Sequence, residues 1–88
     1  MRRSHAHLLR LYHDPHYDFS KVSVDYINRG APSDRSTISG DCIHCLRAGG
    51  MEIDSALGTI YIPYHRILRI FYEGLPIWER GVRMRKEG

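Results

Sequence analysis

Short apolar segments, each closed by a turn signal, do most to limit the folds open to this chain. In the C-terminal half, β-branched and aromatic residues recur in short runs bounded by Gly49-Gly50, by Leu57-Gly58 and by the stretch "EGLP", and such boundaries are typical of strands and tight turns. The expected strands are residues 37–47, 51–56, 59–62, 67–72 and 77–80. Consecutive strands joined by tight turns pair antiparallel, so the sequence favours a β-meander.

A different periodicity marks the N-terminal segment. Ser4 can cap a short helix whose apolar positions follow the i, i+3, i+4, i+7 spacing of one buried face. The expected buried face consists of His5, Leu8, Leu9 and Tyr12. Asp14-Pro15 ends this helix, because proline disfavours helical geometry in the residue before it.

After a connecting turn, the period changes to two. Val22, Val24 and Tyr26 then share one face, which indicates a half-buried strand. The loop "GAPSD" follows this strand. Together these segments predict an α+β fold, in which a short N-terminal helix is followed by a mostly antiparallel β-meander that curls into a small barrel-like sheet.

Length and charge restrict the class of protein. A chain of 88 residues forms one domain with a modest core, which we place at residues 1–80, followed by a basic tail at residues 81–88. The formal net charge is +3 and the pI is about 9.1. This balance favours anionic partners such as RNA, although a solvated tail would produce the same surplus. No apolar run approaches the roughly 20 residues of a membrane span, and the start makes a poor signal peptide, so we expect a cytoplasmic protein with no membrane partner.

Four motifs carry a resemblance to a known family. The chain contains the turn "DPHYD" (residues 14–18), "RGAPSDR" (residues 29–35), "IPYHRI" (residues 62–67) and "WER" (residues 78–80). In this order they resemble a small, mostly archaeal family whose domain is described as an RNA cyclic-group-end recognition domain. Ser33 departs from that pattern, which usually carries glycine there. The resemblance implies recognition of RNA ends, with RNA as partner and a phosphoesterase or other RNA-processing enzyme as a further partner in trans.

The "RGAPSDR" motif contains a candidate phosphate site. Arg29 and Arg35 flank a tight polar loop, and the planar fork of arginine suits the paired oxygens of a phosphate. Gly30 can let a ligand approach the backbone, or it can adopt a positive φ. Alternatively, Asp34 pairs with one arginine and only pins the loop. We predict that Arg29, Gly30 and Arg35 bind RNA or phosphate and that Asp34 supports them.

The "IPYHRI" motif is expected to be irregular. Pro63 cannot donate to a β-ladder, so it marks an edge, a bulge or a strand start, and such irregularities re-aim side chains. In a regular strand His65 and Arg66 would point to opposite faces. Either a bulge near Tyr64 turns one of them, or only one of the two is functional.

The roles in this motif follow from that geometry. Tyr61 and Tyr64 flank Pro63, and either could stack on a base; we predict that Tyr64 does so. We predict that His65, with Arg69 on its face, binds phosphate. Pro63 and Arg66 are expected to support the site, the arginine by bracing the loop through Asp34. For His65 the structural alternative is a satisfied hydrogen bond at the start of a strand.

The histidines and cysteines predict no metal site. The chain has six histidines, but no spacing forces a second one next to His65. Structural zinc needs four ligands, whereas "CIHC" offers only Cys42 and Cys45, which would point to opposite faces of a strand. We therefore predict no metal, no cofactor and no catalytic residue, and two reduced thiols.

Three functions remain as hypotheses. The first is an RNA-binding module that recognises processed RNA ends, with a 2′,3′-cyclic or a terminal phosphate, and catalyses no reaction. The second is a metal-independent RNA phosphodiesterase with His65 as acid or base. The third is an adaptor that docks on a ribonucleoprotein. A second histidine near His65 would favour the enzyme, and a basic concavity with an exposed tyrosine would favour the module.

Overall fold

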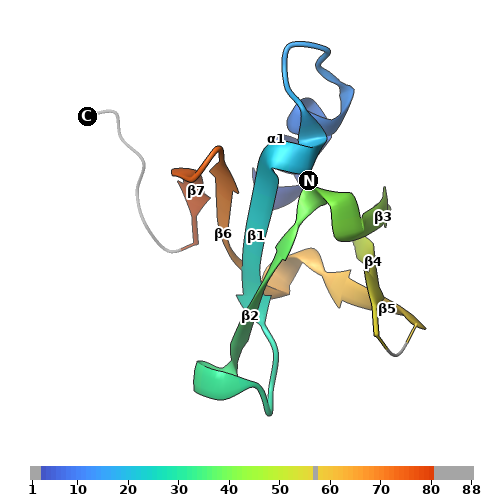
Figure 1. The fold of residues 1–88 in the computed structure, drawn as a ribbon, viewed down its shortest axis with the longest axis vertical. Coiled ribbons are helices and arrows are strands. Elements are labelled where there is room, and N and C mark those ends of the chain that lie inside the picture. The colour runs from blue at the N-terminus through green and yellow to red at the C-terminus, as the bar shows by residue number, and fades with distance from the viewer. Residues whose placement is uncertain (1–2, 57, 81–88) are drawn as a thin grey trace.

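Two antiparallel sheets follow one short helix in the computed structural model of the protein, which describes residues 3–56 and 58–80 (Figure 1). The helix α1 and the strands are α1 (Arg3–His13), β1 (Val22–Ile27), β2 (Arg35–Ser39), β3 (Ile43–Leu46), β4 (Gly50–Ser55), β5 (Gly58–Pro63), β6 (Ile67–Tyr72) and β7 (Leu75–Glu79). Single-turn 3-10 helices between them are η1 (Phe19–Lys21), η2 (Pro32–Asp34), η3 (Gly40–Cys42) and η4 (Tyr64–Arg66). The predicted basic tail, residues 81–88, lies outside the described residues.

The strands divide into a four-stranded sheet with the order β2-β1-β6-β7 and a three-stranded sheet with the order β3-β4-β5. The second sheet is a simple meander. In the first sheet, β1 pairs with β6, and Tyr26 lies opposite Ile67, so distant parts of the chain meet at its centre. The predicted α+β class with antiparallel strands is confirmed. The predicted barrel-like sheet is wrong, because the strands form two separate sheets and close no barrel.

Two 3-10 turns account for this division. The predicted strand at residues 37–47 is interrupted by η3, so it becomes β2 in one sheet and β3 in the other, and η4 leads from β5 back to β6. Gly40 permits the first turn, because a Cβ at this position would overlap the carbonyl group of Phe19 in η1. The chain therefore leaves the first sheet at η3 and returns to it at η4.

The core joins α1 to the inner faces of both sheets. Its buried apolar residues are Leu8, Leu11, Val22, Val24, Tyr26, Ile43, Met51, Ile53, Ile62, Tyr64, Ile67 and Ile70. The period-two prediction for β1 is confirmed. The predicted helix face is partly wrong, because Leu11 is 4% exposed and Tyr12 is 49% exposed. Instead of entering the core, the Tyr12 ring meets Phe19 edge-on at 5.1 Å between ring centroids.

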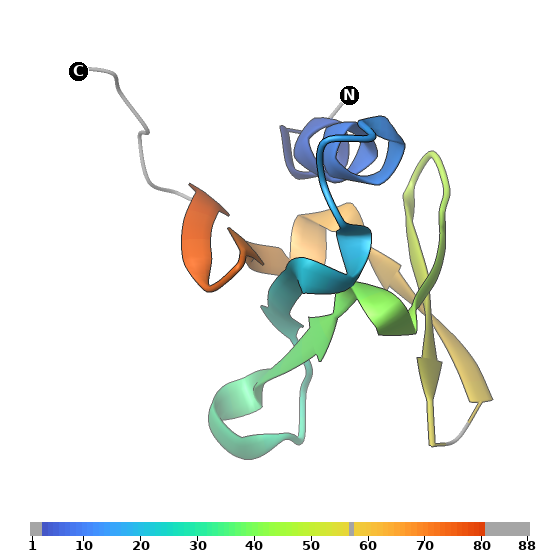
Figure 2. The ribbon, with the colours of Figure 1, turned by 45° about the horizontal axis from the view of Figure 1, so that its top comes forward.

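A ring stack and a hydrogen bond join the helix to η4. Figure 2 shows α1 lying over this turn, between β6–β7 on one side and β3–β4 on the other. The His5 ring stacks on the Tyr64 ring at a centroid distance of 4.2 Å, and the Ser4 hydroxyl donates to the Tyr64 carbonyl at 3.5 Å. No helix in the described ranges has both the length and the apolarity needed to cross a membrane.

Candidate functional site

A cleft of about 220 Å³ opens where the start of α1, the η4 turn and the end of β7 meet. Its lining is basic and aromatic. The residues that form it are Arg3, Ser4, Tyr64, His65, Ile67, Trp78 and Arg80. This combination offers hydrogen-bond donors for an anion beside an aromatic wall, which is the chemistry that a nucleotide phosphate and its base require.

The η4 turn places His65 at the cleft. Pro63 ends β5 with extended geometry, and the Tyr64 amide then donates to the Gly49 carbonyl at 3.2 Å. Successive side chains in a 3-10 helix diverge by about 120° because there are three residues per turn. Tyr64 is consequently buried, whereas His65 and Arg66 are both exposed and leave the turn in different directions. The irregularity predicted at this motif is present, as a helical turn.

Arg80 ties the end of β7 to this turn. One guanidinium nitrogen, Nη1, donates to the His65 carbonyl at 2.6 Å, and the Arg80 amide donates to the Leu68 carbonyl at 2.8 Å. Guanidinium carries five N–H donors, so most of them stay available to an anion in the cleft. Trp78 is half-buried and packs against the core, which gives the cleft a fixed aromatic wall.

Two further donors at the cleft are uncommitted. Within residues 3–56 and 58–80, the side chains of Arg3 and His65 are exposed and make no hydrogen bond or ion pair. An unpaired guanidinium and an unpaired imidazole therefore face an otherwise formed cavity. The structural alternative for His65, a satisfied side-chain hydrogen bond, does not occur here.

The prediction that Tyr64 stacks on a base does not agree with the structure. This side chain is 2% exposed, its ring is covered by His5, and its hydroxyl donates to the Arg47 carbonyl at 2.6 Å. Burial raises the pKa of Tyr64 to about 12. Tyr64 therefore holds α1, η4 and the second sheet together, and it borders the cleft without offering a free ring face.

The "RGAPSDR" loop lies at the turn between β1 and β2 and does not line the cleft. The Asp34 carboxylate accepts a hydrogen bond from the Gly30 amide at 3.2 Å, so it stabilises the loop through a backbone group. In the described part of the chain it forms no ion pair with Arg29, Arg35 or Arg66. The predicted bracing of Asp34 by Arg66 is therefore wrong. Gly30 adopts the positive φ of 94° that its sequence position suggested.

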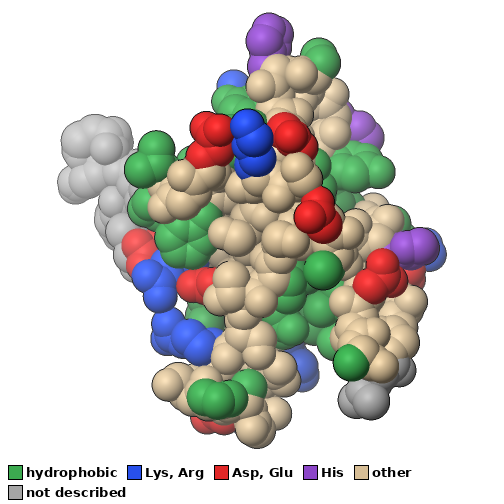
Figure 3. All heavy atoms as spheres, in the orientation of Figure 1, with side chains coloured by type: hydrophobic (Ala, Val, Ile, Leu, Met, Phe, Trp, Pro, Cys, Tyr) green, Lys and Arg blue, Asp and Glu red, His purple; other side chains and the backbone are tan. Residues whose placement is uncertain are grey.

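The charge of Arg69 is largely compensated. Its Nε lies 3.4 Å from Asp25 and 3.9 Å from Glu79, and Asp25 also accepts from the Thr37 hydroxyl at 2.6 Å. Arg69 belongs to the outer face of the four-stranded sheet, and Figure 3 shows basic and acidic side chains interleaved over that sheet. His65 lies in η4 and not on this strand, so the predicted shared face of His65 and Arg69 is wrong.

Three residues of the cleft were missed by reasoning from sequence. They are Arg3, Trp78 and Arg80, to which the sequence analysis gives no site role. The spaced Trp78 and Arg80 of the "WER" motif were the available signal. What the sequence could not show is that β7 ends beside η4, which depends on the pairing of β6 with β7.

The cysteines form no metal centre in the described ranges, which contain no group of three or more His, Cys, Asp or Glu side chains arranged around one point. Cys42 is exposed in η3. Cys45 is half-buried in β3, and its thiol lies 3.4 Å from the Glu52 carboxylate. Burial is the main reason that the pKa of the Cys45 thiol is raised.

Comparison with known proteins identifies the relatives of the chain. It is 37% identical to UPF0248 protein MK0350 of Methanopyrus kandleri over 75 residues, covering 85% of this chain and 96% of the relative. A UPF0248 protein of Archaeoglobus fulgidus is 42% identical over 66 residues, covering 75% and 88%. No solved structure matches the chain. The profile of the MJ1316 RNA cyclic group end recognition domain matches residues 1–80. The four motifs and this match agree, and the chain belongs to the MJ1316 RNA cyclic group end recognition domain family.

Proposed function

We propose that this protein is an RNA-binding module that recognises processed RNA ends carrying a 2′,3′-cyclic phosphate or a terminal phosphate, and that it catalyses no reaction. The observation that carries the proposal is the cleft in which Arg3, His65 and Arg80 meet beside Trp78. The description of the family supports the same ligand class.

The chemistry of the cleft fits such an end. A cyclic phosphate diester carries about one negative charge, which the free N–H donors of two guanidinium groups and one imidazole can meet. Trp78 provides a ring edge or face for the terminal base, as is common in the recognition of single-stranded RNA. Because Arg80 is fixed by the His65 carbonyl, the cleft is partly ordered before the ligand arrives.

Catalysis requires more than this arrangement offers. Ribonucleases that hydrolyse cyclic phosphates need an acid and a base on opposite sides of the phosphorus atom. Among the residues that line the cleft, one imidazole is present, that of His65, while His5 is stacked on Tyr64 and buried. This donor set suits binding.

The "RGAPSDR" loop is proposed to contact the RNA backbone away from its end. Arg29, Arg35 and Arg66 are exposed, and within the described residues their side chains form no hydrogen bond or ion pair. In the first sheet, Ile27 lies opposite Arg35 on one side, and its neighbour Tyr26 lies opposite Ile67 on the other. Arg35 and Arg66 thus flank the same end of β1, where phosphates of a longer RNA could bind both.

The test is titration of labelled short RNAs that differ only in a 2′,3′-cyclic phosphate, a 3′-phosphate or a 3′-hydroxyl end. We expect tighter binding of the phosphate-bearing ends, and His65→Ala should weaken it by roughly 1.5–3 kcal/mol, as for a hydrogen bond to a charged group. His44→Ala is the matched control, because it truncates an exposed histidine of β3 that does not line the cleft, and it should change little. Equal affinity for all three ends would contradict end recognition. Hydrolysis of the cyclic end that is lost in His65→Ala would replace the module with the phosphodiesterase.

A further inference from the structure

A second hollow, of about 300 Å³, lies further along α1, against the β6–β7 hairpin. Its volume is at the lower end of the range of ligand pockets, roughly 300–1,000 Å³. The residues relevant here are His7 and Arg10 on the helix, Tyr17 and Tyr72 at the base, and Leu75 and Ile77 on β7. The lining therefore combines an apolar wall with one arginine and one imidazole.

The two hollows share their walls. On α1, Arg3 borders the cleft and Arg10 borders the second hollow. On β7, Trp78 borders the cleft and Leu75 borders the second hollow. Arg3, His7 and Arg10 have the i, i+4, i+7 spacing of one helix face. At 1.5 Å rise per residue, Arg10 lies about 10 Å beyond Arg3 along the helix axis. A ligand that leaves the cleft along α1 reaches the second hollow next.

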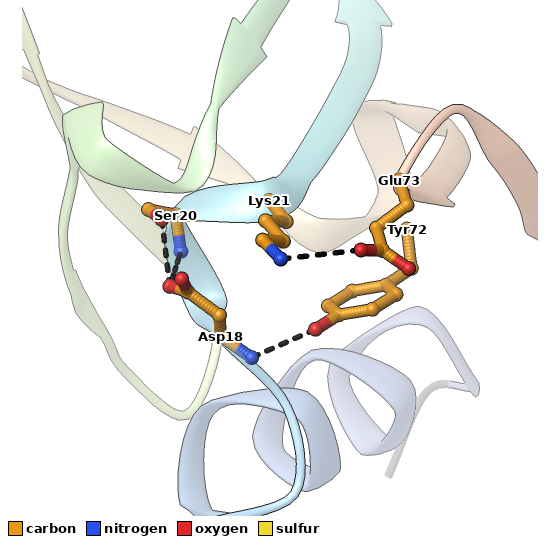
Figure 4. Close-up of polar contacts among 5 residues, drawn as sticks. All are labelled: Asp18, Ser20, Lys21, Tyr72 and Glu73. Atoms are coloured by element: carbon orange, nitrogen blue, oxygen red, sulfur yellow. Dashed lines mark hydrogen bonds and ion pairs between the residues drawn. The ribbon is translucent and has the colours of Figure 1, made fainter.

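The base of the hollow is held in place by polar contacts. The Tyr72 hydroxyl accepts from the Asp18 amide at 2.8 Å (Figure 4). The Tyr17 ring meets the Tyr72 ring edge-on at 5.1 Å between ring centroids. Glu73 also borders the hollow, but Lys21 pairs with its carboxylate at 3.2 Å. The negative charge of Glu73 is therefore balanced by Lys21, and the hollow remains compatible with an anionic ligand.

Two side chains at this hollow have no evident role in the fold. Leu75 is 69% exposed, which is a large exposure for leucine at the edge of a cavity. Burial, together with Arg3 and Arg10, lowers the pKa of His7 from 6.5. At pH 7 its ring is therefore mostly neutral and offers one N–H donor and one acceptor nitrogen.

We propose that the second hollow is the subsite for the nucleotide on the 5′ side of the RNA end, with its base against Leu75 and Ile77 and its phosphate near Arg10. His7 then lies within the same subsite, where it can bond a base edge or a 2′-hydroxyl. The RNA would run along α1 with its 3′ end at Arg3 and His65. This inference rests on the proposed function, because the direction of the RNA strand along α1 depends on the cleft binding the 3′ end of the RNA.

The experiment compares a nucleoside 2′,3′-cyclic monophosphate with the dinucleotide and trinucleotide that end in it. For the wild-type protein we expect the dinucleotide to bind at least about fivefold more tightly than the mononucleotide, because burial of one face of a base against the apolar side chains of Leu75 and Ile77 contributes on that scale. The trinucleotide should add less. Leu75→Ser should remove most of the gain from the second nucleotide and leave mononucleotide affinity within about twofold. Arg10→Ala should also reduce the gain, without a change in the apolar wall.

Ile60→Ser is the matched control, because Ile60 is an exposed apolar residue, 39% exposed, on β5 of the other sheet. It should leave all three affinities unchanged, and thermal melts should show that each variant is folded. If the mononucleotide binds but Leu75→Ser and Arg10→Ala leave the dinucleotide gain intact, the subsite is overturned and the proposed function stands. If none of the three ligands binds, the proposed function fails and the subsite fails with it.

Discussion

At the scale of single residues, Ser33 has a backbone conformation that is unfavourable for a residue with a side chain. It lies in η2 with φ 59° and ψ 16°, in the left-handed region, and Asp34 follows with φ 56°. This conformation costs an L-residue about 1–2 kcal/mol, while glycine adopts it freely but loses more backbone entropy on folding. This backbone conformation explains why glycine would suit the position at which Ser33 departs from the family motif.

We predict that Ser33→Gly raises the free energy of unfolding by about 0.5–1 kcal/mol, which is the difference between the two effects. Urea denaturation measures it. Ser23→Gly in the extended strand β1 is the control and should shift stability in the opposite direction, because only the entropic loss applies there. A loss of stability in Ser33→Gly would show that the serine side chain contributes more than its backbone costs.

His5 should make the fold sensitive to mild acid. Burial lowers the pKa of His5 from 6.5, so below about pH 6.5 the folded protein binds fewer protons than the unfolded chain. The stability that the neutral His5 ring gives the folded state is therefore fully present above that pH. It is lost as the pH falls toward the lowered pKa of His5 in the folded state. His5→Phe keeps a ring on Tyr64 without a titrating group, so its stability should change less between pH 7 and pH 5 in urea melts. An unchanged pH dependence would contradict this account.

At the scale of elements, η4 and β7 act as one unit, because Arg80 donates to the His65 carbonyl. We predict that Arg80→Ala lowers both the thermal midpoint and the affinity for RNA ends. The loss of one hydrogen bond, about 1 kcal/mol, corresponds to about 4–8 °C for a domain of this size. Arg3→Ala should lower affinity alone, since its side chain makes no contact of this kind within the described residues. Calorimetry measures the effect on stability, and RNA titration measures the effect on affinity. An Arg80→Ala variant that melts at the same temperature as the unchanged protein would contradict the structural role of Arg80.

The elements themselves were largely predictable, and their partners were not. Period-two alternation identified β1, and turn residues located β4 to β7 to within a few positions. The helix was correct in position, but its buried face was only partly correct, because a ring as large as that of Tyr12 can pack on Phe19 from outside the core. The pairing of Tyr26 with Ile67 has no local signal. Residues of the site on one short turn could be predicted, and those that meet through long-range pairing, such as Arg3 with Arg80, could not.

At the scale of the whole molecule, the exposed arginines predict a salt dependence that increases with RNA length. For single-stranded RNA each phosphate contact contributes about −0.7 to the slope of log K against log salt. An RNA of about eight nucleotides should therefore give a steeper slope than a dinucleotide with the same end, because it can reach Arg29 and Arg35. The double change Arg29→Ala and Arg35→Ala should reduce the slope for the longer RNA by about 1.4 and leave the dinucleotide unaffected. Equal slopes for the two lengths would exclude these arginines from binding.

The central position of β6 beside β1 has a kinetic consequence. The hairpins β1–β2, β3–β4, β4–β5 and β6–β7 each need only neighbouring residues, so they can form early and locally. The step that joins β1 to β6 must close a loop across the whole three-stranded sheet, and loop closure of this kind slows folding because entropy is lost before contacts form. Substitutions at the β1–β6 seam should therefore act mainly on the refolding rate, whereas substitutions within the three-stranded sheet should act mainly on the unfolding rate.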